Sequence, residues 1–163
     1  MKRISIIAVF VIFNSLICSG QSFSKYKPQK SRFIPETFNL KQTVSEIISY
    51  GTVDAYAVGY SGTVTEQYSR FVRLKANASI LDLVLLTKHY NAVIRAYAFW
   101  ALADKEYGGI KQIIIDHLSD IQTFQFHSGC MSKNIRINKW FIDTGKKFLT
   151  ADEILNYQKE ISK

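Results

Sequence analysis

The sequence predicts an all-α fold, a short stack of five to seven helices within one domain at residues 41–163. Apolar residues recur at three- and four-residue spacing over much of this range, which is the periodicity of an amphipathic helix. Proline is absent after Pro35, so no residue of this kind interrupts closely spaced helices. Residues 85–99 also align with residues 113–127 at an offset of 28 residues, which suggests repeated helical units.

The N-terminal segment has the layout of a secretory signal peptide. Lys2 and Arg3 precede a mostly apolar run, Ile4–Ile17, and small residues follow it up to Gly20. The run is shorter than the ~20 residues that a membrane-spanning helix needs. We therefore expect cleavage between Gly20 and Gln21, removal of residues 1–20, and a periplasmic or secreted protein.

Cys18 raises the alternative of a lipoprotein acylated on this thiol. Lipoprotein signals usually place a small residue directly before the cysteine and an aliphatic residue three positions before it. Ile17 and Ser15 occupy these positions, so the match is poor. Cleavage after Gly20 leaves Cys130 as the one cysteine, which excludes an internal disulfide and makes the hydrophobic core responsible for stability.

Residues 21–40 predict a basic, extended arm. Four basic side chains precede Glu36, and both prolines of the chain, Pro28 and Pro35, lie here, which disfavours helix and sheet. The arm is interpreted as a solvated linker, with contact to a membrane surface as the alternative. Without the two cations of the signal the net charge falls from +8 to about +6, but nucleic acid is a poor partner outside the cytoplasm.

The elements of residues 41–163 follow in order. Thr43–Tyr50 is predicted to be a helix that residues 53–58 continue past Gly51, and the Gly-Tyr-Ser-Gly sequence at residues 59–62 is a turn. A hydroxyl side chain with an acid three residues later can cap a helix N-terminus and complement its dipole. Three such capping boxes predict helix starts, at Thr63/Glu66, Ser79/Asp82 and Thr150/Glu153.

Further helices are predicted on both sides of a glycine pair. Asn91 caps a helix that runs to about Asp104, and the Tyr-Gly-Gly sequence at residues 107–109 ends it. Ile110–Leu118 forms the next helix, and residues 138–144 form a short one.

Two segments of the C-terminal half do not follow the helical pattern. Residues 123–131 alternate between apolar and polar side chains, and residues 135–137 are rich in β-branched side chains, both of which are typical of strands. No partner strands are evident in the sequence. We therefore interpret both segments as irregular or helical.

The segment His89–Leu102 resembles the second-helix signature of HEAT-type repeats. Ile94, Arg95, Ala98, Ala101 and Leu102 match the pattern of that signature, while Ala92 replaces a frequent loop proline. The resemblance covers residues of about 79–131 and implies a right-handed α-solenoid of helical hairpins. In such repeats the matching arginine bonds carboxylates or carbonyl groups along the groove between units, so Arg95 is predicted to be a structural strut, with anion capture as the alternative.

Few residues suggest chemistry. His127 and Cys130 could form a thiolate nucleophile, and with His117 they could bind zinc, but no recognised catalytic or metal motif surrounds them. We interpret Cys130 as an ordinary thiol and expect no catalytic residue, metal or cofactor. His117 aligns with His89, which suggests a structural role at a helix end. Tyr60 and Tyr68 belong to an aromatic group that is either a ligand groove or a satellite of the core.

These observations favour a non-enzymatic binding or scaffold protein that acts outside the cytoplasm through a helical-repeat surface. Its partner is expected to be another protein. This inference rests on analogy between folds, because the sequence contains no motif that specifies a ligand. Two alternatives remain open: a Cys/His-dependent hydrolase centred on Cys130 and His127, and a periplasmic inhibitor or immunity protein that blocks a toxin.

Overall fold

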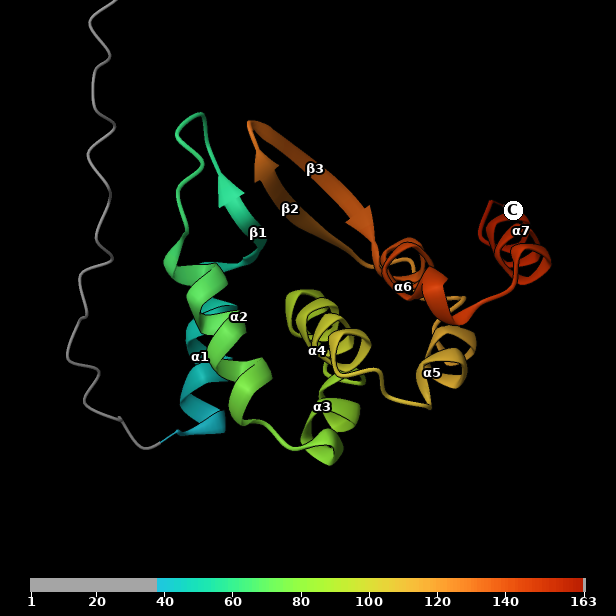
Figure 1. Ribbon diagram of the computed structural model, residues 1–163, viewed down its shortest axis with the longest axis horizontal. Coiled ribbons are helices and arrows are strands. Elements are labelled where there is room, and N and C mark those ends of the chain that lie inside the picture. Colours follow the sequence, from blue (N-terminus) through green and yellow to red (C-terminus); the bar gives the residue numbers. More distant parts are fainter. Residues whose placement is uncertain (1–37, 163) are drawn as a thin grey trace, which may run out of the picture. The chain divides into compact units, whose positions relative to one another are not determined.

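A three-stranded sheet distinguishes the structure from the predicted all-α fold (Figure 1). The computed structural model describes residues 38–162, and these residues form a mixed α/β arrangement of seven α-helices, one 3-10 helix and three strands. The elements are α1 (Leu40–Tyr50), β1 (Thr52–Val58), α2 (Glu66–Asn77), α3 (Ile80–Leu86), α4 (Ala92–Asp104), α5 (Ile110–Asp116), β2 (Thr123–Gly129), β3 (Met131–Arg136), α6 (Ile137–Gly145), the 3-10 helix η1 (Lys146–Phe148) and α7 (Ala151–Glu160).

The strand order is β1-β2-β3, with β1 parallel to β2 and β2 antiparallel to β3. Helices α2 to α5 all lie in the connection between the two parallel strands. Asp54 on β1 is the register partner of His127 on β2, and His127 is in turn the register partner of Ser132 on β3. The sheet thus brings Asp54 into one row with His127 and Ser132, although Asp54 lies 73 residues before His127 in the sequence.

The prediction that residues 53–58 continue the first helix is wrong. Gly51 adopts a left-handed conformation (φ 85°), and its N–H donates to the carbonyl of Ile47, which ends α1. The chain then extends as β1, where the fully buried Val53 pairs with Phe126 of β2. The stabilising partner of this strand is supplied about 70 residues later, a long-range pairing that local periodicity does not report.

The interpretation of residues 123–131 and 135–137 as irregular or helical is also wrong, except that Ile137 begins helix α6. They form most of the hairpin β2–β3, and each strand is the partner that the other one needs. Gly129 and Cys130 make the two-residue turn, with Gly129 at φ 52°. Glycine at the first central position is typical of the turn type that suits the twist of hairpin strands.

The right-handed α-solenoid is not formed, because the second of the two aligned segments does not repeat the structure of the first. Residues 85–99 lead from α3 through a turn into α4, whereas residues 113–127 lead from α5 into β2. The 28-residue offset is therefore not a structural repeat.

Several predicted helix starts are confirmed. The boxes at Ser79/Asp82 and Thr150/Glu153 each make both reciprocal hydrogen bonds. Asn91 caps α4 by accepting from two backbone N–H groups, and α4 ends at Asp104 as predicted.

The start predicted at Thr63 is wrong by two residues. Thr65 is the N-cap of α2 and accepts from the N–H of Tyr68 at 3.1 Å. Thr63 forms an isolated antiparallel bridge with Val58, which closes the turn after β1. Because Thr65 is the N-cap, its hydroxyl faces the sheet, where it donates to the carboxylate of Asp54.

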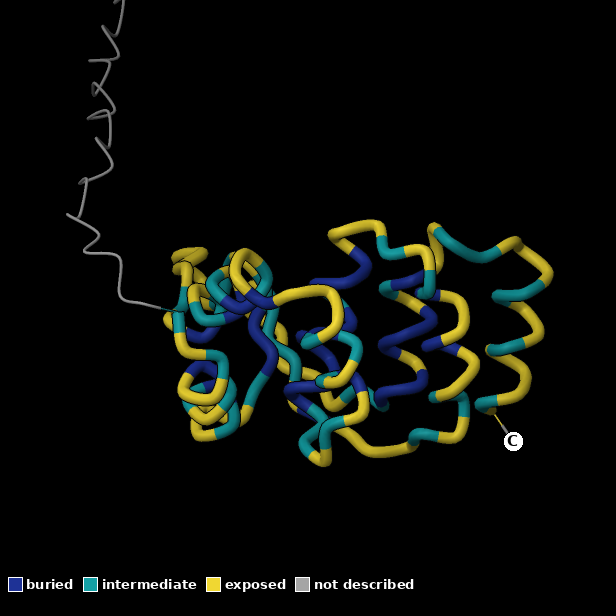
Figure 2. Tube along the Cα trace, turned by 90° about the horizontal axis from the view of Figure 1, so that it is seen from below, coloured by how far each residue is buried: buried dark blue, intermediate teal, exposed yellow. Residues whose placement is uncertain are grey.

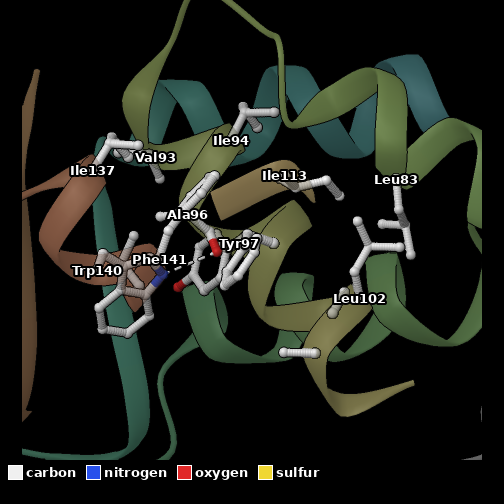
Figure 3. Close-up of a cluster of buried hydrophobic side chains, with 14 of the residues drawn as sticks. Leu83, Val93, Ile94, Ala96, Tyr97, Leu102, Ile113, Ile137, Trp140 and Phe141 are labelled. Carbon is white, nitrogen blue, oxygen red and sulfur yellow. Dashed lines mark hydrogen bonds between the residues drawn. The ribbon is translucent and has the colours of Figure 1, made fainter. Parts of the chain in front are cut away.

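Helix α4 lies at the centre of the core, and nearly its whole circumference is buried (Figure 2). A helix that is apolar all round must be enclosed by other elements, and α2, α3, α6 and the sheet pack against it. The indole Nε1 of Trp140 donates to the carbonyl of Ala96 at 3.2 Å (Figure 3). The rings of Phe99 and Phe141 stack with centroids 4.0 Å apart. These contacts fix α6 against α4.

Tyr97 links the core helix to the first strand. Its hydroxyl accepts a hydrogen bond of 2.8 Å from the backbone N–H of Asp54. Burial, the largest effect, raises the pKa of Tyr97 well above its usual value, so this hydroxyl stays neutral.

The predicted signal peptide (residues 1–20) and nearly all of the predicted basic arm (residues 21–40) lie outside the described residues. Within residues 38–162, no helix combines the length and the apolar character that crossing a bilayer requires.

Candidate functional site

The carboxylate of Asp54 is the most enclosed acidic group of the described residues, with none of its residue surface exposed. Its Oδ1 accepts from the hydroxyl of Thr52 at 2.9 Å, and its Oδ2 accepts from the hydroxyl of Thr65 at 2.8 Å. Nδ1 of His127 lies 3.1 Å from Oδ1. Buried carboxylates are costly unless such donors satisfy them, so this arrangement holds Asp54 as an acceptor of three hydrogen bonds.

His127 connects this buried carboxylate with solvent. Its side chain is 26% exposed, whereas that of Asp54 is 1% exposed. Because a carboxylate only accepts hydrogen bonds, Nδ1 of the neutral ring carries the proton and Nε2 carries the free lone pair. No group within residues 38–162 hydrogen-bonds Nε2. Asp54 thus fixes the ring orientation and leaves Nε2 available as a proton acceptor.

Ser132 lies on the same face of the sheet as His127. Nε2 of Gln125 donates to Oγ of Ser132 at 2.9 Å, so these two side chains share a face. Gln125 and His127 are two residues apart on β2 and therefore point to the same side. Together with the register, this places Asp54, His127 and Ser132 side by side on three adjacent strands. We call this set the Asp54–His127–Ser132 row.

An open groove of about 410 Å³ lies next to Gln125, which donates to Oγ of Ser132. Gln125 and Asn134 line it from the sheet, and Tyr90 and Asn91 line it from the turn before α4. All of its lining side chains are uncharged, and Tyr90 is mostly exposed. The groove therefore offers amide groups and an aromatic ring, which suit a neutral polar molecule of small size.

The outer edge of β3 is open. In the part of the chain that the structure describes, β2 is the one strand that pairs with β3 (Figure 1). Residues 131–134 are exposed, and neither Lys133 nor Arg136 forms an ion pair with an acid of residues 38–162. The edge thus combines unpaired backbone groups with positive charge.

Two of the residues singled out from the sequence lie at the end of the sheet. Tyr60 is in the turn after β1 and is fully exposed, and Cys130 is exposed in the hairpin turn. The N–H of Gly59 donates to the carbonyl of Gly129 at 2.8 Å, which joins the two turns. No hydrogen bond links Cys130 to His127. The pairing that the structure favours for His127 is with Asp54, which lies on another strand.

Tyr68 packs against other aromatic side chains. Its ring lies 5.6 Å from that of Tyr56 in an edge-to-face arrangement and 5.7 Å from that of Phe71. These distances are typical of stabilising aromatic pairs. Tyr68 is partly buried against the core and does not take part in the Asp54–His127–Ser132 row.

Arg95 is buried away from this row and bonds two connecting segments. Nη1 donates to the carbonyls of His89 and Tyr90 at 2.6 and 3.0 Å. Nη2 donates to the amide oxygen of Gln122 at 2.7 Å, and Nε lies 3.0 Å from Oδ2 of Asp120. The guanidinium therefore joins the turn before α4 to the segment before β2, and it has few donors left for an anion.

His117 also has structural partners. Its Nε2 lies 2.8 Å from the carbonyl oxygen of Thr87 at the end of α3, and its ring lies 5.0 Å from that of Phe141. Burial, the largest effect, lowers the pKa of His117, and the nearby Asp120 opposes this shift. His117 therefore bonds the end of α3, and no hydrogen bond joins it to the Asp54–His127–Ser132 row.

The sequence analysis missed Asp54, Thr65 and Ser132. One signal could have identified them: a Gly-Cys pair at residues 129 and 130 between two alternating segments is typical of a two-residue hairpin. Recognition of that hairpin places Ser132 opposite His127. No local signal predicts that Asp54 joins them, because its strand is parallel and distant.

The chain matches no protein-family model and shows no significant match to a curated protein or to a solved structure. Within residues 38–162, no group of three or more histidine, cysteine or acidic side chains is arranged to hold a metal ion. The geometry of the site is therefore the observation that bears on function.

Proposed function

We propose that the protein acts outside the cytoplasm and binds an extended, acidic segment of a partner protein along the outer edge of β3. The observation that carries this proposal is the open edge of that strand. An exposed sheet edge can accept a further strand, in which backbone hydrogen bonds provide affinity and side chains provide specificity. A helical-repeat surface is no longer a candidate, because the solenoid is not formed.

The geometry of the hairpin defines which backbone groups are free. The two-residue turn makes Ser128 and Met131 the closing pair, and the pairs of an antiparallel ladder alternate between hydrogen-bonded and non-hydrogen-bonded. The N–H and C=O groups of Ser132 and Asn134 therefore point away from β2. They supply donors and acceptors to an incoming strand at the spacing of every second residue.

The positive charge of the β3 edge favours an acidic partner segment. Lys133 and Arg136 are positive, and the described part of the hairpin contains no acid. Edge lysines disfavour pairing with a second copy of the same strand, because like charges would face each other. Glutamate or aspartate on an incoming segment would instead complement these side chains and speed its association.

The location is part of the proposal and rests on residues 1–20 as a signal peptide. N-terminal sequencing of the protein recovered from the cell envelope or medium tests it. A mature chain that begins at Gln21 supports export, and a protein retained in the cytoplasm with Met1 contradicts it.

A labelled peptide tests the binding role. The probe is a fluorescein-labelled peptide of roughly eight residues, long enough for one strand, with alternating glutamate and valine. Fluorescence anisotropy should show saturable binding that weakens with added salt, because the contacts are charged. The same peptide with lysine in place of glutamate should bind at least about tenfold more weakly.

Variants distinguish the β3 edge from general attraction to a basic protein. The double variant Lys133→Glu/Arg136→Glu should abolish binding, while Lys105→Glu, an exposed charge reversal at the residue that follows α4, should not. Asn134→Pro removes an outward N–H but no bond of the β2–β3 ladder, so it should also weaken binding while the circular dichroism spectrum is preserved. Equal binding by all three variants would contradict the proposal.

A further inference from the structure

We propose that the Asp54–His127–Ser132 row is an acyl-transfer site that hydrolyses a small uncharged ester. In this site Ser132 is the nucleophile, His127 is the general base, and Asp54 is the positioning residue. The inference goes beyond the proposed binding role and does not depend on it.

Ser132, His127 and Asp54 stand in the order nucleophile, base and orienting acid. A base within reach of the nucleophile, itself oriented by a third group, is the arrangement that activates a serine hydroxyl. Asp54 and His127 meet this condition at 3.1 Å, with the carboxylate buried and held by two threonine hydroxyls. The protonated Nδ1 faces Asp54 on β1, so Nε2 is the ring nitrogen left to accept a proton.

His127 and Ser132 lie directly opposite each other across the hairpin. They form a non-hydrogen-bonded pair of the hairpin, in which the Cα atoms approach to roughly 4.5 Å and the side chains are closest. Oγ of Ser132 now accepts from Gln125, which leaves its own proton free to be donated. Rotation about χ1 of Ser132 directs Oγ toward the imidazole ring, and such contacts often tighten when substrate binds.

The reaction follows from these positions. Oγ of Ser132 attacks the ester carbonyl carbon while Nε2 of His127 takes the hydroxyl proton. The bond from carbon to the alcohol oxygen then breaks, and the imidazolium returns the proton to the departing alcohol. A water molecule attacks the acyl-serine, again with loss of its proton to Nε2, and releases the carboxylic acid and the original hydroxyl. No oxidant, metal or further reactant is needed.

The groove beside the row indicates the substrate class. Gln125 lines the groove and donates to Oγ of Ser132, so a molecule bound in the groove would lie beside the hydrogen-bond partner of this hydroxyl. The volume of about 410 Å³ suits a small molecule, and the uncharged lining of amides and the Tyr90 ring suits one with hydroxyl or amide groups. A neutral ester fits this chemistry better than a charged one.

A serine-directed probe tests the assignment on the folded protein. We expect a biotinylated fluorophosphonate to label Ser132, located by peptide mass spectrometry, and p-nitrophenyl acetate to be hydrolysed. Ser132→Ala should abolish both signals, whereas Ser128→Ala, in the same hairpin, should preserve them. His127→Gln should slow labelling by about 100-fold, because general bases contribute at least that factor.

The pH profile separates a catalytic role from a structural one. Labelling of the natural protein should depend on pH, and this dependence should disappear in His127→Gln. Asp54→Asn should slow labelling as well, since an amide donates to Nδ1 and leaves Nε2 protonated. Failure to label Ser132 above the level of Ser128, or labelling that His127→Gln leaves unchanged, would overturn the inference. Peptide binding by Ser132→Ala, measured by anisotropy, reports separately on the binding proposal.

Discussion

Nε of Arg95 lies 3.0 Å from Oδ2 of Asp120, and their side chains are 7% and 18% exposed. The ion pair is thus largely shielded from water, and three oxygen atoms of His89, Tyr90 and Gln122 complete the bonding of the guanidinium. Shielded pairs of this kind contribute little net energy compared with apolar residues, but the loss of one partner leaves a buried charge without compensation.

Asp120→Asn should therefore destabilise the protein by about 3–5 kcal/mol, because the Arg95 charge then stays buried without its counter-ion. Urea denaturation followed by circular dichroism measures the free energy of unfolding. Lys147→Ala is the control, since Lys147 forms an exposed ion pair with Glu106 and its loss should leave the midpoint nearly unchanged. Equal midpoints for both variants would show that the Arg95 network is not structural.

Gly129→Ala should destabilise the hairpin by about 1–2 kcal/mol, because an L-residue at φ 52° is strained even where space is free. No atom lies within 4 Å of a Cβ added at this position, so the effect reports backbone conformation alone. Gly108→Ala is the matched control: it also has free space, and its φ lies outside the left-handed range. The midpoint of thermal denaturation should fall in the Gly129→Ala variant and stay unchanged in the Gly108→Ala variant.

Gly145→Ala tests close packing at the end of α6. An added Cβ would lie 2.7 Å from Cδ1 of Ile114 and 3.1 Å from Cζ of Phe99, so these side chains would have to move. Overpacking of this kind typically costs about 1–3 kcal/mol. The double variant Gly145→Ala/Ile114→Val removes the Cδ1 atom and should recover part of the loss in urea denaturation. No recovery would indicate that the contact with Phe99 causes the loss.

Stability should fall as the pH is lowered below about 6.5, the usual pKa of histidine. Burial lowers the pKa of both His117 and His89 in the folded protein, so the unfolded chain binds protons first as the pH falls. The stabilisation is complete above pH 6.5 and is lost as the pH drops from there toward the lowered folded values. Urea midpoints between pH 8 and pH 5 measure this slope, which His117→Gln should reduce. A slope unaltered by that change would assign the effect to other groups.

Helix α4 shows which features could be predicted from the sequence. Asn91 supplies an N-cap, and the apolar residues that follow continue to Asp104, so both ends and the type of this element are encoded locally. The capping boxes at Ser79 and Thr150 are equally local. In each case the decisive hydrogen bonds join residues at most four positions apart.

The sheet could not be predicted in the same way, because its stability is not local. Residues 53–58 are held in β1 by Phe126, His127 and Tyr97, and the shared apolar content of strand and helix made continuation of α1 a reasonable expectation. Ser132 has no local pattern that marks it as reactive, and its relation to His127 depends on the register of the hairpin.

The parallel pairing of β1 with β2 has a consequence for synthesis. Synthesis proceeds from the N-terminus, so β1 is made long before residues 123–129. Helices α2 to α5 must all be made before the two strands can pair. Non-local pairing of this kind folds slowly. Any fragment that stops before Thr123 therefore keeps β1 without its neighbour, and the complete sheet forms only once residues 52–136 have all been made.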